Sequence, residues 1–198
     1  VRYTAFVEGV VLPKPPWAIV PVKGNTSPDP TRRAREKKVL AHRAFPQAEQ
    51  SLWIDGCFRI EQSFSRALSG YLELLRDHDL VTFKHVEHDC TFEHGRSVVE
   101  RGLDAARIVE PQLARYRAAG LPLHAGMVQT HVIFRRHTER TARFNELWWE
   151  EIKKGSRRDQ VSFIWAARET GLRYVALGPE ERTHFRGMSH RGTRIPVT

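Results

Sequence analysis

The stretch Gln50-Ser-Leu-Trp-Ile-Asp55-Gly56 decides how the rest of the chain is interpreted. A short apolar run that ends in an acid and a glycine is typical of a buried strand whose carboxylate emerges at its carboxyl end. Ligands of open α/β sheets bind beyond that end of the strands. Asp55 is therefore the first candidate functional residue, and Gly56 leaves room for a ligand to approach. The structural alternative is an acid that caps a turn.

Strands and helices alternate along the chain on both sides of this stretch. Runs rich in β-branched and aromatic residues predict strands at 3–11, 17–22, 50–55, 80–85, 128–135 and 174–177. Apolar residues at helical spacing predict helices at 32–43, 65–76, 97–119, 142–154 and 159–169, and Pro111 is expected to divide the third. This alternation predicts an α/β fold with a mixed central sheet flanked by helices.

The length and composition predict one soluble domain. The 198 residues fit a single domain over 1–198 that ends in a basic tail at 178–198. No apolar run exceeds five residues, far below the roughly 20 that a membrane span needs. No secretory leader opens the sequence, so we expect a cytoplasmic protein, in the host cell cytoplasm if a phage encodes it. The two cysteines cannot form a disulfide framework. The sequence leaves the oligomeric state open.

Positive charge is the strongest compositional signal. The formal net charge is +9, and 25 of the 32 basic residues are Arg. Guanidinium groups bind phosphate and carboxylate groups through a planar fork, so this surplus favours a polyanionic partner such as DNA or an acidic polysaccharide. A GC-rich coding sequence would produce the same arginine surplus without any function.

A series of short blocks carries a resemblance to a known family. The blocks are Asp29-Pro-Thr-Arg-Arg-Ala-Arg35, Phe45-Pro46, Trp53-Ile-Asp-Gly56, Phe83-Lys-His85, Asp89-Cys90, residues 126–135, Trp148-Trp149 and Arg158-Asp-Gln-Val-Ser-Phe163. Through them the chain resembles the glycosyltransferase-like domain formerly called domain of unknown function 616, over roughly residues 3–172. Plant members of that family are linked to pectin and mucilage synthesis. The chain departs from the family at His88, where Arg is frequent, and at His94, where an acid is usual.

The resemblance implies a GT-A-like nucleotide-binding sandwich and a nucleotide-sugar donor, with UDP as the expected nucleotide. In that fold a central acid helps to hold Mn²⁺ or Mg²⁺ on the donor diphosphate, and Asp55 takes this position. GT-A enzymes usually carry an Asp-x-Asp motif, but here the second acid is replaced by Cys57, which is not a hard ligand. A distant histidine, His184 or His190, is therefore expected to complete the metal site.

The basic helix before Asp55 is expected to bind the donor. Arg35, Lys38 and His42 share one face at spacings of three and four residues. We expect this face to meet the donor pyrophosphate or the nucleotide, together with Asp55, Gly56 and Gln160. The structural alternative is a solvated basic helix surface.

Two carboxylates are candidates for the base that an inverting transferase needs to deprotonate the acceptor. Asp159 is the first choice, although as the opening residue of a helix it also suits an N-terminal cap. Glu93 is the second choice. A retaining enzyme needs no such base, and Asp159 with Gln160 would then bind sugar or acceptor. The sequence does not decide the stereochemistry.

Acceptor contacts are expected from residues that flank these elements, namely His85, Asp89, Arg135, Trp149 and Arg158. One ring of the Trp148-Trp149 pair is expected in the core and the other on a sugar or base. His85, His88, Cys90 and His94 also have ligand types that suit zinc, although their spacing matches no known zinc-finger signature.

These features together predict a metal-dependent glycosyltransferase that moves a sugar from a nucleotide sugar to a hydroxyl acceptor. One acceptor is a hydroxymethylated base in DNA, as in phage-type DNA modification, which requires base flipping. The other is a polysaccharide. Two alternatives come from other classes: a non-catalytic nucleic-acid-binding module on the same fold, and a zinc-stabilised interaction protein.

Overall fold

A mixed four-stranded sheet forms the centre of the protein in a computed structural model, which describes residues 1–9, 15–22 and 27–188. Its strands, in the order of the sheet, are β3 (Gln50–Ile54), β6 (Val128–Arg136), β5 (Leu80–Lys84) and β7 (Tyr174–Leu177). Strand β6 is antiparallel to both neighbours, whereas β5 and β7 are parallel. The predicted α/β class is confirmed, and the arrangement is consistent with a GT-A-like sandwich.

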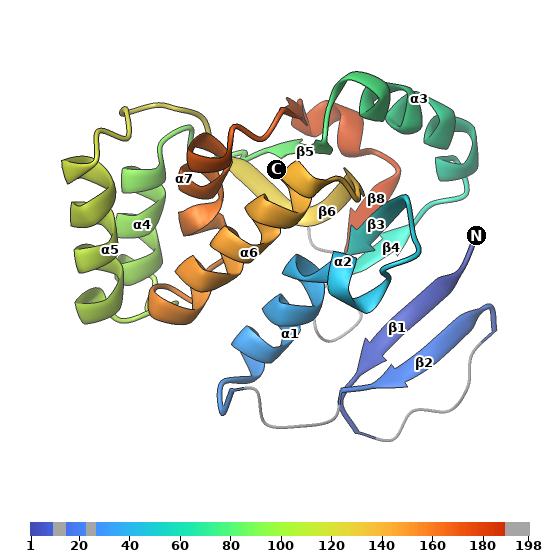
Figure 1. Ribbon diagram of the computed structural model, residues 1–198, viewed down its shortest axis with the longest axis horizontal. Coiled ribbons are helices and arrows are strands. Elements are labelled where there is room, and N and C mark those ends of the chain that lie inside the picture. Colours follow the sequence, from blue (N-terminus) through green and yellow to red (C-terminus); the bar gives the residue numbers. More distant parts are fainter. Residues whose placement is uncertain (10–14, 23–26, 189–198) are drawn as a thin grey trace.

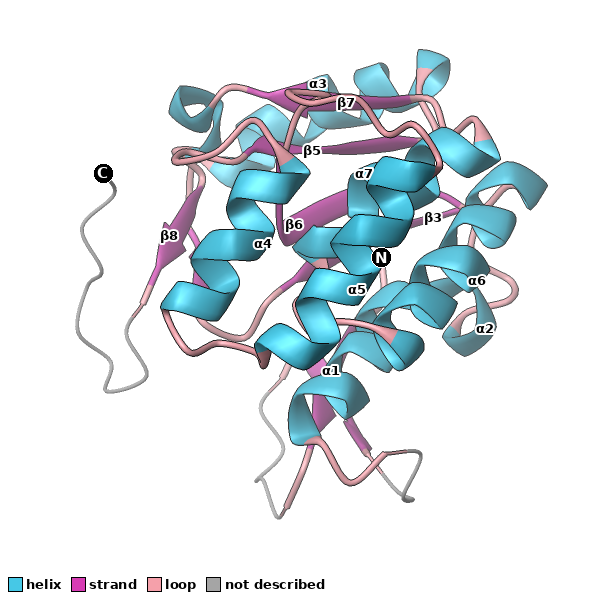
Figure 2. Ribbon diagram, turned by 90° about the vertical axis from the view of Figure 1, so that its left-hand side faces the viewer, coloured by secondary structure: helices cyan, strands magenta, loops and turns pink. Residues whose placement is uncertain are grey.

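Most helices lie on one face of this sheet (Figures 1 and 2). They are α1 (Pro30–Val39), the short α2 (Ala41–Ala44), α4 (Thr91–Glu100), α5 (Ala106–Ala118), α6 (Glu139–Lys154) and α7 (Gln160–Thr170). Thr138 caps α6 by accepting from the amide of Thr141, and α7 ends at Gly171 with φ of 61°. The main core on this face includes Trp148 and Phe163.

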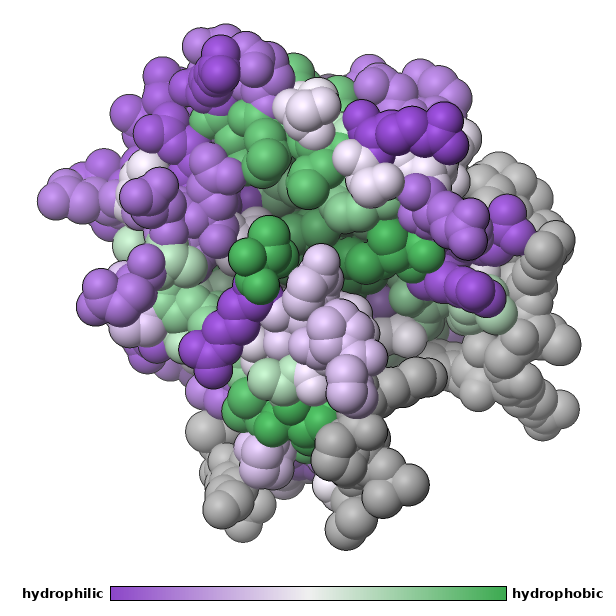
Figure 3. Space-filling view, turned by 90° about the vertical axis from the view of Figure 1, so that its right-hand side faces the viewer, coloured by the Kyte–Doolittle hydropathy of each residue, from purple (hydrophilic) through white to green (hydrophobic). Residues whose placement is uncertain are grey.

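The opposite face carries α3 (Phe64–Asp77), the antiparallel pair β4 (Phe58–Ile60) and β8 (Phe185–Gly187), and the 3₁₀ helix η1 (Pro179–Arg182). A separate parallel pair, β1 (Tyr3–Val7) and β2 (Trp17–Pro21), packs through Phe6 against Trp53 of β3, with ring centroids 6.5 Å apart. Figure 3 views the side with α3 and this pair, where apolar side chains gather between polar ones. None of the described helices is long and apolar enough to cross a membrane.

The predicted helix at 97–119 was wrong in its start and in its break. Helix α4 begins at Thr91, in the stretch predicted as a histidine-rich loop, and the chain turns at Gly102 with φ of 64°. Pro111 lies inside α5. An internal proline costs about 3 kcal/mol, and the buried side chains of Val109 and Tyr116 on either side of it offset that cost.

The predicted helix at 32–43 is interrupted. Leu40, with φ of −89° and ψ of 36°, ends α1, and α2 follows at once. This break removes His42 from the face that Arg35 and Lys38 share.

The described part of the predicted basic tail is folded. Phe185 of β8 is buried against Tyr71 and Phe134, with ring centroids 6.2 and 6.1 Å from theirs. Strands β4 and β8 have no local signal in the sequence, because three-residue strands depend on pairing between distant segments. Residues 189–198 lie outside the described part.

Candidate functional site

Asp55 lies at the sheet edge that the sequence predicted. Its amide donates to the carbonyl oxygen of His131 at 2.8 Å, so the carboxyl end of β3 meets the beginning of β6. The indole Nε1 of Trp53 donates to Asp55 Oδ1 at 2.6 Å. The carboxylate is thereby held by its own strand and aimed at α1 and α7.

The ammonium group of Lys38 lies between two carboxylates. Its Nζ is 2.7 Å from Asp159 Oδ2, 3.3 Å from Asp55 Oδ1 and 3.1 Å from the hydroxyl of Thr130. Lys38 is fully buried. A buried charge is tolerated only when it is paired and hydrogen-bonded, and Lys38 meets both conditions.

Arg35, one turn earlier on α1, faces the same two acids. Its Nε is 3.1 Å from Asp159 Oδ1, and its Nη1 is 4.0 Å from Asp55 Oδ2. Burial alone would raise the pKa of Asp159, but Arg35 and Lys38 lower that pKa well below its ordinary range. We call Arg35, Lys38, Asp55 and Asp159 the ion cluster.

Arg135 fixes the end of α1 that carries Lys38. Its guanidinium is fully buried and donates to the carbonyl oxygens of Lys38 at 2.8 Å and Val39 at 3.1 Å. Burial lowers the pKa of Arg135 to about 10. A fully buried guanidinium offers no surface to an acceptor, so Arg135 is a positioning residue and not the acceptor contact that the sequence predicted.

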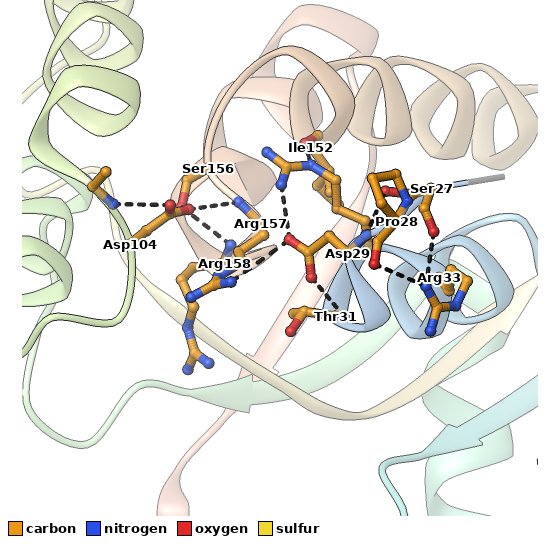
Figure 4. A network of polar contacts seen from close by, with 12 residues as sticks. Ser27, Pro28, Asp29, Thr31, Arg33, Asp104, Ile152, Ser156, Arg157 and Arg158 are labelled. Atoms are coloured by element: carbon orange, nitrogen blue, oxygen red, sulfur yellow. Dashed lines mark hydrogen bonds and ion pairs between the residues drawn. The ribbon is translucent and has the colours of Figure 1, made fainter. Parts of the chain in front are cut away.

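The loop that presents Asp159 is fixed by a polar network (Figure 4). The carboxylate of Asp104 accepts from the hydroxyl of Ser156 and the amide of Arg157, each at 2.9 Å. Arg32 donates to the carbonyl oxygen of Gly155 at 2.6 Å. The side chain of Asp159 makes no capping hydrogen bond, so the simple capping role does not apply. Its carboxylate is left to face α1.

Buried nitrogen donors without a partner surround the ion cluster. Among the described residues, Arg158 Nε, Arg182 Nε and His131 Nδ1 are buried and make no hydrogen bond. Arg182 donates to the side chain of Gln129 through another nitrogen, and its guanidinium lies 5.4 Å from the ring centroid of Phe58. Figure 4 shows the guanidinium of Arg158 extending away from the Asp104 network. Unpaired buried polar groups are uncommon in native proteins, and here they indicate the place of a polar ligand.

Three histidine rings lie beside this region. The ring centroids of His85, His88 and His94 are 4.8 to 5.5 Å apart. Burial lowers the pKa of His94 to about 3, and the charges of Arg158 and Asp159 also act on it. Both ring nitrogens of His94 are buried without a partner. Because these nitrogens are neutral, they add polarity but no positive charge to the site.

Several predicted residues lie away from the ion cluster. His42 Nε2 is 2.9 Å from Glu146 of α6, and His184 Nδ1 is 2.8 Å from the hydroxyl of Ser63. Trp149 is 8 % exposed and belongs to the main core, so it is not placed to stack on a sugar. His190 lies outside the described residues. The predicted donor contact at His42 and the metal ligand at His184 are therefore not supported by position.

The second predicted carboxylate, Glu93, faces a different group. A ligand atom of Glu93 lies within 4.8 Å of ligand atoms of buried Cys90 and exposed His124. His124 Nδ1 is also 2.7 Å from the exposed carboxylate of Asp89. An open group with one buried thiol and an imidazole already paired to an acid is a weak metal site.

Gly56, next to Asp55, and Gln160, next to Asp159, differ in exposure. Gly56 is exposed, and a Cβ built there would meet no atom within 4 Å among the described residues. Gln160 is buried behind Asp159 at 5 % exposure. Open space therefore lies on the Gly56 side.

Asp55 and its neighbours do not fit a divalent cation. Asp55 Oδ1 accepts from Trp53 and lies beside Lys38, whereas Oδ2 faces Arg35. Both oxygens of Asp159 are also paired with cations. Mg²⁺ and Mn²⁺ need several free oxygen ligands, and two fixed cations would repel a third.

The sequence reasoning missed Thr130 and His131, and it considered Arg182 only as one of the basic residues of the tail at 178–198. Gln129, Thr130 and His131 are three consecutive polar residues at the start of an otherwise apolar strand, and that interruption was an available signal. Arg182 had no such signal, because η1 and β8 bring it back from a distant segment.

One cavity of the described structure lies away from this site. A cavity of about 480 Å³ lies at the other end of β3 and β6, among Glu49, Gln50, Leu75, Arg76, Arg136, His137 and Thr138. It contains no member of the ion cluster and no residue that the sequence predicted for the site.

Comparisons with known proteins bear on the chemistry of this site. The model of a family described as TOD1/MUCI70, glycosyltransferase-like domain, matches residues 15–175. A curated relative from Arabidopsis thaliana, named as a probable hexosyltransferase MUCI70, is 28% identical over 154 residues, which is 74% of this chain and 26% of the relative. The chain thus spans about a quarter of that relative's length. No solved structure matches the chain.

Proposed function

This chain belongs to the TOD1/MUCI70 glycosyltransferase-like family, and from that premise we propose that it transfers a hexosyl group from a nucleotide sugar to a hydroxyl group. The observation that carries the proposal is the ion cluster and the unpaired buried donors around it. They lie at the carboxyl end of β3, where ligands of α/β sheets bind.

The local charge suits a diphosphate. Within the ion cluster, the charges of Arg35 and Lys38 balance those of Asp55 and Asp159. Arg158 and Arg182 have no carboxylate partner among the described residues, so the surroundings carry a surplus of positive charge. Guanidinium groups with free nitrogens bind phosphate oxygens through paired hydrogen bonds.

The arginines act on the step in which the donor is cleaved. The bond between the anomeric carbon and the diphosphate oxygen breaks, and negative charge develops on the departing diphosphate. Donors that are already in place stabilise this charge without rearrangement. Arg158 and Arg182 are the residues that we propose to contact the diphosphate.

The acceptor hydroxyl loses its proton as the new glycosidic bond forms. Asp159 does not suit this role, because its carboxylate is 1 % exposed and held by Lys38 and Arg35. A strongly lowered pKa also makes it a weak proton acceptor. Glu93 stays the proposed base, and a Glu93→Gln variant that keeps full transfer activity would remove it from the mechanism.

For the acceptor we propose a polyanion, supported by the net charge of +9. DNA with hydroxymethylated bases is the first candidate and an acidic polysaccharide is the second. Incubation with each acceptor and a panel of nucleotide hexoses, followed by mass spectrometry of the digested products, tests both. A non-catalytic nucleic-acid-binding module would instead bind DNA with a steep salt dependence and release no nucleoside diphosphate.

The diphosphate contacts are tested by three arginine variants. We expect Arg158→Gln and Arg182→Gln each to lower kcat/KM for the donor by about tenfold to hundredfold, as loss of a charged hydrogen bond does. Arg186→Gln is the matched control, because Arg186 lies near Arg182 in sequence but pairs with Glu61 at 2.9 Å. Equal losses in all three variants would contradict the assignment.

A further inference from the structure

We infer that this protein binds its donor diphosphate without a divalent cation, because Lys38 occupies the space between Asp55 and Asp159 where a cation was expected. In this scheme Lys38 is a positioning residue, and Arg158 and Arg182 supply the positive charge that meets the diphosphate. The inference rests on the proposed function and deepens it.

The first argument is the position of the ammonium group. Asp55 follows β3 and Asp159 precedes α7, so two carboxylates from distant segments meet at one point. Lys38 Nζ lies 3.3 Å from one and 2.7 Å from the other, and it also contacts the Thr130 hydroxyl at 3.1 Å. A metal ion that bridged the same two acids would need this space.

The second argument is that Lys38 cannot move aside. Its side chain is fully buried. The backbone that carries it is fixed by two hydrogen bonds from Arg135, at 2.8 Å to the Lys38 carbonyl and 3.1 Å to that of Val39. Moving the buried ammonium away from both partners would leave its own charge unpaired and would leave only Arg35 to balance the two carboxylates, which is strongly destabilising.

The third argument is that the carboxylate oxygens are already engaged. Asp55 Oδ1 accepts from Trp53 Nε1 at 2.6 Å, and Asp159 Oδ2 accepts from the Thr130 hydroxyl at 2.8 Å. The remaining oxygens face Arg35, at 4.0 Å for Asp55 Oδ2 and 3.1 Å for Asp159 Oδ1. These acids therefore serve to hold two cations of the protein.

The fourth argument concerns the charge that a metal would otherwise supply. Arg158 and Arg182 each keep a buried Nε without a partner. The segment after Arg158 is anchored through the Trp148 indole, which donates to the Asp159 carbonyl at 2.8 Å. Such fixed donors can neutralise a diphosphate without a cofactor.

The test is a titration of the full chain, stripped of metal, with UDP and in parallel with GDP, by isothermal titration calorimetry. One arm contains EDTA and the other excess Mn²⁺. We expect a nucleotide to bind with dissociation constants that agree within about twofold between the arms. Binding that tightens tenfold or more with Mn²⁺ would overturn this inference and leave the proposed function standing. Binding in neither arm would overturn both.

A variant gives an independent readout. Lys38→Ala opens the space between the two acids, so we expect Mn²⁺ to raise the melting temperature of this variant by several degrees and to leave that of the unchanged chain unaltered. If the variant does not fold, equilibrium dialysis of Mn²⁺ against the unchanged chain tests whether that chain binds the cation. Stoichiometric Mn²⁺ binding that Asp55→Asn abolishes would contradict the inference.

Discussion

Two of the ionic networks among the described residues on the helical side of this protein differ in their surroundings, because only the ion cluster has unpaired buried donors around it. In the network of Glu151, the carboxylate accepts from Arg115 at 3.0 and 2.6 Å, from the Tyr116 hydroxyl at 2.6 Å and from Gln112 at 3.3 Å. Gln112 also accepts from the amide of Ser156 at 2.8 Å. The polar groups of this network satisfy one another.

The ion cluster also pairs carboxylates with basic side chains but differs in its surroundings. Its four charges pair internally, whereas Arg158, Arg182 and His131 around it keep buried nitrogens without a partner in the described structure. Burial and pairing alone therefore mark a structural network. Around the ion cluster several unpaired donors lie together and favour a ligand, whereas single buried atoms without a partner, such as Thr4 Oγ1 and His137 Nδ1, also occur elsewhere in the described structure.

The largest effect that separates the two networks is expected from Lys38→Met. This change leaves Asp55 and Asp159 facing each other without the ammonium, which costs about 3–5 kcal/mol of unfolding free energy. Loss of the ammonium also releases Asp55 and Asp159 from their present positions, and with Asp159 the neighbouring Arg158. The affinity for UDP should therefore fall at least tenfold. Lys37→Met is the control, because Lys37 neighbours Lys38 but lies in a long ion pair of 3.7 Å with Glu36, and the change should alter stability by about 0.5 kcal/mol or less. Urea unfolding and calorimetry check both variants.

Glu151→Gln tests the other network. Arg115 is half exposed and stays solvated, so loss of the charged hydrogen bonds to Glu151 is expected to cost about 1.5–3 kcal/mol of unfolding free energy, while the affinity of the folded protein for UDP stays unchanged. Urea unfolding gives the first quantity and calorimetry below the melting temperature gives the second. A parallel loss of affinity would mean that the two networks are not independent.

Between pH 7.5 and 5.5, acid should weaken the ion-cluster region and not the Glu151 network, because hydrogen bonds from Arg115 and Tyr116 outweigh burial and lower the pKa of Glu151, so that this carboxyl titrates below that window. Burial lowers the pKa of His94 to about 3 and of His131 to about 4, so the unfolded chain takes up protons first. The contribution of these two neutral histidines to the free energy of unfolding is complete above about pH 6.5 and is lost as the pH falls toward 4. At pH 5.5 each of these histidines should lower the free energy of unfolding by roughly 1.4 kcal/mol relative to its value at high pH.

Urea unfolding between pH 7.5 and 5.5 measures this loss. His131→Asn should flatten the pH dependence of the unfolding free energy, and an unchanged slope would exclude His131 as a source.

The smallest expected difference comes from a matched pair of hydroxyl deletions. Thr130→Val removes a hydroxyl that donates to Asp159, and Tyr116→Phe removes one that donates to Glu151. Each should cost about 1–3 kcal/mol of unfolding free energy. Only Thr130→Val should weaken UDP binding, by a few-fold. Its partner Asp159 holds Lys38 in the ion cluster, whereas Glu151, the partner of Tyr116, does not. Equal effects on binding would remove the distinction between the two networks.

Local patterns in the sequence were sufficient for the sheet and for part of the site. The helix predicted at 32–43 begins near its predicted start, where Asp29 caps α1 by accepting from the Thr31 amide at 2.8 Å. A strand that ends in Asp55 and a helix that follows Asp159 both formed at the predicted places. The structure also brings Arg35, Lys38, Asp55 and Asp159 together.

Other features depend on contacts between segments that are distant in the sequence. The spacing of residues along the chain does not predict such contacts. The burial of Arg135 depends on the carbonyl oxygens at the end of α1, and the position of Arg182 depends on η1 and β8. His42 left the predicted face because the backbone turns at Leu40. Lys38 was predicted to bind the donor, but the sequence could not show that it lies between two acids.

A crystal structure of the protein with UDP bound, grown in EDTA, tests the central claim most directly. We predict the diphosphate within hydrogen-bonding distance of Arg158 and Arg182, with Lys38 still between Asp55 and Asp159 and no metal ion beside them. UDP bound in the cavity near Glu49 and Arg136 at the other end of the sheet would contradict this account.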